Sequence, residues 1–179
     1  MNDTNIQSIY QKTIAFAAEH HGQQKMPNGF SYIVHLSNVA MEVFMAYKQK
    51  PDFDLKLAIQ LALLHDVLED TVLSFKRLEN DFGNLVATSI LALTKDSTLD
   101  KKDQIDDSLN RILNLGREVA IVKLCDRITN LQKPPKKWDN AKIKKYHLQA
   151  LKIAERLKGK NEYLDKRIQE KILNFKTYF

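Results

Sequence analysis

Four ionisable side chains follow one another closely at the end of an apolar stretch. Residues 57–64 are almost entirely apolar, and His65, Asp66, Glu69 and Asp70 come directly after them. In a helix, residues four positions apart share a face, so His65 would lie beside Glu69 and Asp66 beside Asp70. Buried carboxylates this close repel one another unless a cation compensates them. Imidazole and carboxylate are both ligands of divalent metals, so the pattern predicts a metal site.

A second apolar stretch with one polar face supports this interpretation. In residues 119–132, Asp126 and Asn130 are four positions apart, and Lys123 and Arg127 are on the same polar face. A helix that is apolar on most of its surface is buried, so its few polar side chains point toward a site or need partners inside the protein. Asp126 is therefore a second candidate carboxylate ligand.

Two simpler interpretations compete with a metal site. Residues 65–70 could form an exposed acidic turn, because a His-Asp pair alone is weak as a motif. His35, which opens a helical stretch after a loop, would by itself be typical of a capping or packing histidine. The combination of the three stretches favours the metal site over either alternative.

The elements that must position these residues are all expected to be helices. Apolar side chains recur at helical spacing, and no alternating run of β-branched residues is long enough to indicate a strand. Glycine and proline residues mark the breaks between them. The pattern predicts one all-α domain over residues 1–179, with helices at about 4–20, 35–48, 54–69, 73–82, 84–94, 101–114, 117–131, 140–158 and 162–176.

Composition narrows the class of protein. An apolar content of 44% and a charged content of 28% are typical of a soluble globular domain. The first residues lack the pattern of a signal peptide, and no apolar run approaches the roughly 20 residues of a membrane span. The single cysteine, Cys125, excludes an internal disulfide and fits a reducing compartment. We therefore expect a cytoplasmic protein without a membrane partner.

Positive charge is concentrated near the end of the chain. Residues 132–179 contain 14 Lys/Arg and 5 Asp/Glu, a net charge of +9, whereas the whole chain has a net charge of +6. Such a segment could attract nucleic acid or phosphorylated ligands. The lysines are scattered and are not interleaved with aromatic residues, which favours solvated helix faces for most of them. A nucleic-acid partner is therefore not expected.

The combination of motifs resembles a known family of enzymes. His35, His65-Asp66 and Asp126 are similar to the H…HD…D ligand set of the HD superfamily. More narrowly, the chain resembles the hydrolase domain of the RelA/SpoT alarmone enzymes and best the small, free-standing alarmone hydrolases of the metazoan SpoT-homologue type. The specific part is the HDxxEDT string at residues 65–71. The resemblance also covers His20-His21-Gly22-Gln23, Tyr32-Ile33-Val34-His35, Ala92-Leu93-Thr94-Lys95 and Val122-Lys123-Leu124-Cys125-Asp126-Arg127.

The resemblance implies a compact, single-domain HD-type helical phosphohydrolase fold and a definite reaction. It implies removal of pyrophosphate from the ribose 3′ position of guanosine tetra- or pentaphosphate, which leaves GDP or GTP. The resemblance assigns one Mn²⁺ to the two histidines and two aspartates, although this donor set would also accept Fe²⁺, Co²⁺ or Zn²⁺. It assigns the attacking water to Glu69 and Asp70, which are not expected to be metal ligands. The metal ligands that the resemblance implies are His35, His65, Asp66 and Asp126.

The nucleotide contacts depart from the family pattern. The loop that usually carries an Arg-Lys pair reads Gln24-Lys25-Met26, so Lys25 is the one matching cation. Asn130 is kept. In the segment that grips the 5′ phosphates, Lys142 takes the place of the more familiar arginine and Tyr146 matches. Lysine lacks the bidentate fork of arginine, so its phosphate contact is less directional. The expected substrate contacts are Lys25, Asn130, Lys142 and Tyr146.

These departures leave three functions to compare. A metal-dependent (p)ppGpp hydrolase is favoured. The same machinery could act on another 3′- or 2′-phosphorylated nucleotide, such as NADPH. A non-catalytic HD module that binds nucleotide and signals to a partner is less favoured, because degenerate modules typically lose the ligands or the Glu-Asp pair. In each case the ligand is a small nucleotide, and the sequence predicts no oligomeric state.

Overall fold

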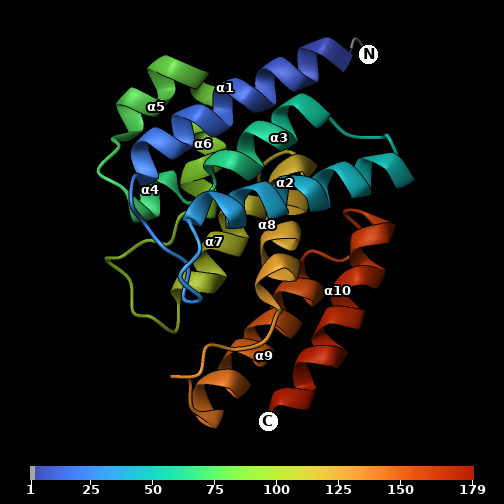
Figure 1. Ribbon diagram of the computed structural model, residues 1–179. Helices are drawn as coiled ribbons and strands as arrows, with labels where there is room; N and C mark the ends of the chain where they lie inside the picture. The colour runs from blue at the N-terminus through green and yellow to red at the C-terminus, as the bar shows by residue number, and fades with distance from the viewer. Residues whose placement is uncertain (1–2) are drawn as a thin grey trace.

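A computed structural model describes residues 3–179, and these residues form helices joined by short connections (Figure 1). They contain no strand, although Lys25 and Ser31 form one isolated antiparallel bridge. None of the helices has the length and apolarity to cross a membrane. The helices are α1 (Asp3–His21), α2 (Tyr32–Gln49), α3 (Leu55–Leu64), α4 (Val67–Asp70), α5 (Phe75–Phe82), α6 (Asn84–Leu93), α7 (Gln104–Leu113), α8 (Arg117–Asn130), α9 (Asn140–Arg156), α10 (Glu162–Phe175) and a 3-10 turn at Lys176–Tyr178. The predicted all-α fold is confirmed.

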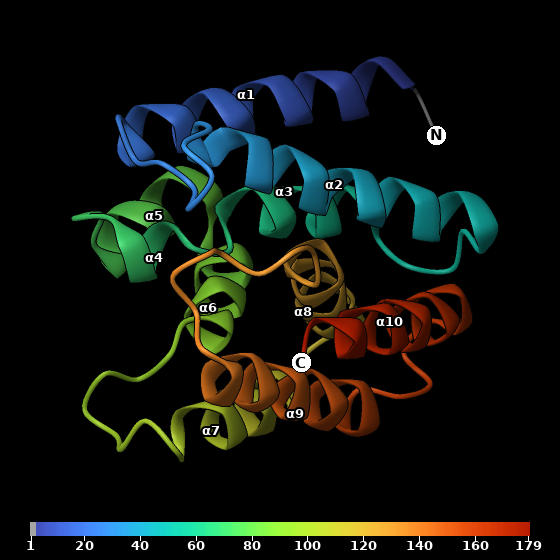
Figure 2. The same cartoon turned by 60° about the horizontal axis from the view of Figure 1, so that its bottom comes forward.

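Two buried helices organise the core. The helix α3 packs against α1, α2, α6 and α8, and α8 also packs against α2, α7, α9 and α10. Figure 2 shows α8 almost end-on in the middle of the molecule, with α1 to α3 on one side of it and α9 and α10 on the other. Both central helices are apolar on nearly every side, and Leu61, Leu64, Ile121 and Leu124 are fully buried. A polar side chain on either helix is therefore inside the protein.

The predicted helix over residues 54–69 is wrong as a single element. The helix α3 ends at Leu64, His65 and Asp66 form a turn, and α4 follows as one short turn of helix. Asp66 has φ −105° and ψ 0°, outside the helical range and in the region that often holds active-site residues. Its carbonyl accepts a hydrogen bond from the backbone N–H of Asp70 at 2.8 Å. The break therefore sets the direction of Glu69 and Asp70 separately from that of α3.

Side-chain caps fix where several helices begin. The Asp54 carboxylate accepts hydrogen bonds from the backbone N–H groups of Lys56 and Leu57, at 2.9 and 3.1 Å. These bonds satisfy donors that the first turn of α3 leaves without a partner. The Asp54 backbone N–H in turn donates to the Glu118 carboxylate at 2.9 Å, which ties the start of α3 to the start of α8. Hydrogen bonds of Asp54 and Glu118 therefore link the first turns of the two central helices.

Removing this cap should destabilise the protein. Asp54→Ala removes both hydrogen bonds to the first turn of α3, and we expect it to lower the free energy of unfolding by about 1 kcal/mol. Urea unfolding followed by circular dichroism measures this change. Asp103→Ala is the matched control, because Asp103 precedes α7 without a side-chain capping bond. Equal losses in both variants would contradict the role given to the Asp54 cap.

Candidate active site

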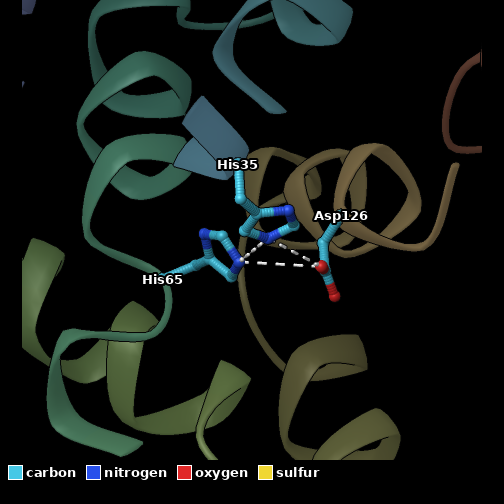
Figure 3. A group of neighbouring side chains, drawn as sticks. All are labelled: His35, His65 and Asp126. Atoms are coloured by element: carbon cyan, nitrogen blue, oxygen red, sulfur yellow. Dashed lines mark hydrogen bonds and ion pairs between the residues drawn. The ribbon is translucent and has the colours of Figure 1, made fainter. Parts of the chain in front are cut away.

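Three predicted ligands from distant parts of the sequence meet in the core. His35 lies in the first turn of α2, His65 in the turn after α3 and Asp126 on α8 (Figure 3). The Nε2 atoms of the two histidines are 3.3 Å apart. Each lies close to Asp126 Oδ1, at 3.5 Å from His35 and 3.6 Å from His65. These atoms surround one point, as the ligands of a metal ion do.

Asp66 lies beside this group. Its Oδ2 is 2.9 Å from Nε2 of His65 and 3.9 Å from Nε2 of His35. The same oxygen accepts a hydrogen bond from the hydroxyl of Tyr32, which precedes His35 by one turn of α2. The four predicted ligands are thus brought together. The contact of Tyr32 could not be read from the sequence, because it joins two segments that are 34 residues apart.

Neighbouring groups hold the ligands in orientation. His65 donates a hydrogen bond from Nδ1 to the carbonyl of Ala62 at 2.9 Å, which leaves its Nε2 free to face the cluster. The amide of Asn130 donates to Asp126 Oδ1 at 2.5 Å, and the Lys123 ammonium lies 3.6 Å from Oδ2. Asn130 and Lys123, on the predicted polar face of α8, therefore hold the carboxylate of Asp126 in place.

Charges of opposite sign lie side by side in the cluster. Burial alone would lower the pKa of His65, but the carboxylates of Asp66 and Asp126 outweigh it and hold this pKa well above its ordinary value. Burial opposes the charged form of both aspartates, yet the pKa of Asp66 is lowered by His65, and the pKa of Asp126 is lowered by both histidines and Lys123. The carboxylates therefore stay ionised inside the core and require positive charge beside them.

A cavity of about 530 Å³ opens beside the cluster. This volume is within the usual range for a small-molecule site. Asp66 and Asp126 line it, so the predicted metal ligands and the cavity form one site. Both carboxylate and cationic side chains line it. The lining residues are Tyr32, Asp66, Glu69, Asp70, Lys95, Lys101, Gln104, Ile105, Lys123, Asp126, Arg127, Asn130, Lys145, Tyr146 and Gln149.

Glu69 and Asp70 line the cavity, and each has a partner. The Glu69 carboxylate forms an ion pair with the Lys95 ammonium and accepts a hydrogen bond from the Lys95 backbone N–H at 3.2 Å. Burial alone would lower the pKa of Lys95, but Glu69 outweighs it and raises this pKa. Asp70 Oδ2 accepts a hydrogen bond from the Gln24 amide at 2.8 Å. Neither carboxylate belongs to the group of atoms that surrounds the metal position.

The four predicted nucleotide contacts separate into two pairs. Asn130 and Tyr146 line the cavity, whereas Lys25 and Lys142 do not. The Lys142 ammonium lies over the ring of Trp138, 4.8 Å from its centroid. Lys25 is exposed and forms the bridge to Ser31. The cavity has cationic lining residues that were not among the predicted contacts: Lys95, Lys101, Lys123, Arg127 and Lys145.

Comparison with known proteins shows the family to which this chain belongs. Residues 13–161 match the HD domain family. The chain belongs to the HD-domain family. A relative from Danio rerio, guanosine-3′,5′-bis(diphosphate) 3′-pyrophosphohydrolase MESH1, is 30% identical over 93% of this HD-domain chain and 93% of its own. Its counterpart from Homo sapiens is 29% identical over 86% and 87% of the two chains. The resemblance to the small alarmone hydrolases is confirmed.

Solved structures agree with the HD-domain assignment. A structure described as a metazoan ortholog of SpoT that hydrolyses ppGpp covers 96% of this chain, with a TM-score of 0.80 and 25% identity. A Listeria monocytogenes protein, lmo0812, has a TM-score of 0.63 over 79% of this chain at 17% identity, and it supports the fold alone.

The donor set of this HD-domain site fits a divalent cation. With neutral imidazoles, the four side chains carry two negative charges. Two nitrogens and one oxygen, from His35, His65 and Asp126, lie around one point, and Asp66 Oδ2 lies beside them, 2.9 Å from His65 Nε2. Hydrogen bonds from Ala62 and Asn130 fix the ring of His65 and the carboxylate of Asp126, as is common around metal ligands. The residues present therefore match a metal in both charge and donor type.

Removing a ligand should remove the metal. We expect wild-type protein dialysed against buffered Mn²⁺ to retain one ion per chain, and His65→Ala and Asp126→Ala to retain far less, because each loses a buried donor. Elemental analysis after gel filtration measures the ratio of metal to protein. His20→Ala is the control, because His20 packs on Phe16, donates to its carbonyl and is outside the cluster. Retention of the ion by either ligand variant would exclude that residue as a ligand.

Proposed function

We propose that this chain is a metal-dependent hydrolase that removes the 3′-pyrophosphate from guanosine tetra- and pentaphosphate to give GDP or GTP. The observation that supports it most directly is that Asp66 and Asp126 of the His-His-Asp-Asp cluster line a cavity that is also lined by Glu69, Asp70 and five cationic side chains. A substrate with a diphosphate at both the 3′ and the 5′ position needs positive charge on both sides of the ribose. The names of the MESH1 relatives support the choice of this substrate.

The metal is proposed to be Mn²⁺, held by His35, His65, Asp66 and Asp126, and Fe²⁺, Co²⁺ or Zn²⁺ would suit the same donors. When bound, a divalent ion at this position stabilises negative phosphoryl oxygens and lowers the pKa of nearby water. Asn130 keeps the Asp126 carboxylate in place through its amide, and Tyr32 does the same for Asp66 through its hydroxyl. These two residues position ligands and do not take part in proton transfer.

The proton transfers are assigned to Glu69 and Asp70. The water oxygen forms a bond to the phosphorus next to the ribose, the bond from this phosphorus to the 3′ oxygen breaks, and the 3′ oxygen takes up a proton. A carboxylate of α4 accepts the proton that the water loses. The ion pair with Lys95 holds the Glu69 carboxylate in place at the cavity. Gln24 fixes the second carboxylate, Asp70, through its amide.

The nucleotide is proposed to contact Asn130 and Tyr146, both in the cavity wall. Burial raises the pKa of Tyr146 to about 12, so its hydroxyl remains a hydrogen-bond donor at neutral pH. Lys25 and Lys142 lie outside the cavity lining. These two lysines are proposed to attract phosphate groups toward the cavity over a longer distance. The proposed location is the cytoplasm, supported by the single Cys125, which is buried and free.

One observation favours a second substrate class, nucleotides with a 2′-phosphate such as NADPH. The side chain of Gln24 is engaged on both sides, because its amide donates to Asp70 and its carbonyl accepts from His21 Nδ1 at 2.7 Å. Gln24 is also not among the residues that line the cavity, so it offers no contact there that selects guanine over another base.

Product analysis separates the two substrates. Metal-loaded protein is incubated with ppGpp and, separately, with NADPH, and the products are identified by anion-exchange chromatography and mass spectrometry. The proposal predicts GDP and pyrophosphate from the first and much slower release of phosphate from the second. Faster conversion of NADPH would favour the second substrate class, and no product from either would contradict both.

Isosteric changes of the two carboxylates test their role in catalysis. Glu69→Gln and Asp70→Asn keep the side-chain shape but remove the base, so we expect at least one of them to lower kcat by about 10² to 10⁴. Metal content and nucleotide affinity should remain close to those of the wild type. Steady-state kinetics with ppGpp measures the change, with Glu79→Gln and Asp81→Asn on the surface as matched controls. Near-normal turnover in both active-site variants would exclude α4 as the source of the base.

A further inference from the structure

The two carboxylates of α4 are engaged to different extents. Both oxygens of Glu69 have a partner in Lys95, because the ammonium forms an ion pair with Oε1 and the backbone N–H donates to Oε2 at 3.2 Å. Asp70 is held at Oδ2, by the amide of Gln24 at 2.8 Å. Among the residues that the structure describes, no group donates a hydrogen bond to its Oδ1. Asp70 lines the cavity, so this oxygen can accept from a molecule bound there.

Gln24, in the loop after α1, is held through both its backbone and its side chain. Its backbone N–H donates to the carbonyl of His21 at 2.9 Å, and its backbone carbonyl accepts from the N–H of Tyr32 at 3.1 Å. Its side-chain Oε1 accepts from His21 Nδ1 at 2.7 Å. An amide that is held on both sides has little freedom to turn. Its N–H therefore reaches Asp70 from a fixed direction.

The direction of these hydrogen bonds follows from the carboxylate at their end. A carboxylate can only accept, so the Gln24 side chain must face Asp70 with its NH₂ group and His21 with its oxygen. An oxygen that faces Nδ1 requires His21 to carry a proton on this nitrogen. His21 is only 5% exposed and its Nε2 has no hydrogen-bond partner, so a proton on Nε2 would be a buried donor without an acceptor. Both observations indicate the same tautomer, with the proton on Nδ1.

His21 also contacts the metal side of the site. Its ring packs on the ring of Tyr32, with centroids 4.9 Å apart, and the hydroxyl of Tyr32 donates to Asp66, a predicted metal ligand. The backbone N–H of Asp70 donates to the carbonyl of Asp66 at 2.8 Å. The Asp70 side chain is thus tied to Asp66 on two routes, one through the backbone and one through the end of α1.

We propose that His21 and Gln24 are positioning residues of the reaction, and that they hold Asp70 so that its Oδ1 accepts the proton of the attacking water. This inference rests on the proposed function and assigns the base to one of its two carboxylates. A proton on Oδ1 leaves the hydrogen bond from Gln24 to Oδ2 intact. A proton on Glu69 would instead remove the negative charge that its ion pair with Lys95 requires.

The step transfers one proton to Asp70. As the water oxygen forms its bond to phosphorus, one O–H bond of the water breaks and the proton passes to Oδ1. The bond from phosphorus to the 3′ oxygen breaks, its electron pair remains on this oxygen, and the oxygen takes up a proton from solvent. Asp70 then releases its own proton to solvent, so the protein returns to its initial state.

Replacing either positioning residue should slow the reaction without weakening substrate binding. Gln24→Leu cannot donate to Asp70, and we expect it to lower kcat about tenfold to hundredfold with KM unchanged, in steady-state kinetics with ppGpp. His21→Phe keeps a ring beside Tyr32 but removes the donor, so it should behave like Gln24→Leu. His21→Asn places an amide N–H near the position of Nδ1 and should restore part of the rate. Gln23 is exposed and adjacent, and Gln23→Leu is the matched control.

Chemical rescue identifies the base. Formate is a small carboxylate that can occupy the space left by a deleted side chain. We expect formate to raise the turnover of Asp70→Ala by about tenfold or more and to leave that of Glu69→Ala unchanged. Rescue of Glu69→Ala alone would assign the base to Glu69 and overturn the proposal. If formate rescues neither variant, the isosteric pair decides, and a slower Glu69→Gln than Asp70→Asn would also overturn it.

The tautomer of His21 is measured without any reaction. Long-range ¹H–¹⁵N correlation spectra of the Zn²⁺-loaded protein distinguish the two ring nitrogens, and the loss of one signal in His21→Asn assigns it. We expect a proton on Nδ1. A proton on Nε2 alone would reverse the Gln24 amide, point its oxygen at Asp70 and overturn the positioning role.

The outcomes separate this inference from the proposed function. If wild-type protein hydrolyses ppGpp and Gln24→Leu matches Gln23→Leu, the positioning role is wrong and the hydrolase proposal stands. If the product comes from NADPH instead, the same variants are compared on that nucleotide. If no nucleotide is turned over, the proposed function fails and the assignment of the base fails with it, whereas a proton on His21 Nδ1 would still support the hydrogen bonds to Asp70.

Discussion

The architecture depends on two buried imidazoles, the buried carboxylate of Asp126 and the partly buried carboxylate of Asp66, which meet between α2, α8 and the turn after α3. Ionised carboxylates inside a core repel one another and destabilise the fold unless positive charge lies among them. In this protein, the pKa values of Asp66 and Asp126 remain low despite burial, and that of His65 is raised by these carboxylates. The core is thus built around a place for a cation.

This requirement explains the break between α3 and α4. A continuous helix would direct His65 and Glu69 to one face, and the base would then share the position of the metal ligands. The turn at His65 and Asp66 separates the two roles. His65 and Asp66 face the cluster, whereas Glu69 and Asp70 line the cavity and have partners of their own in Lys95 and Gln24.

Most of the fold could be predicted from the sequence, because helical periodicity is a local pattern, whereas the metal ligands stay a prediction whose side chains the structure brings together. Helical periodicity and glycine or proline breaks predicted the helices to within a few residues, and the polar residues on two apolar stretches pointed to His65 and Asp126. His35 joined the predicted ligands only through the resemblance to the HD superfamily. The break at Asp66 was missed because apolar periodicity continues through it. The positions of Lys142 and Lys145 could not be predicted, because neighbouring lysines differ only in which ring or cavity their side chains meet.

The most direct test of the central claim is the position of the metal itself. Crystals of the Mn²⁺-loaded protein, measured at the manganese absorption edge, give an anomalous difference map that locates the ion. The account predicts one peak bounded by the Nε2 atoms of His35 and His65 and by the carboxylates of Asp66 and Asp126, with Glu69 and Asp70 not coordinated. A peak between Glu69 and Asp70, or no peak at the histidines in metal-loaded crystals, would contradict it.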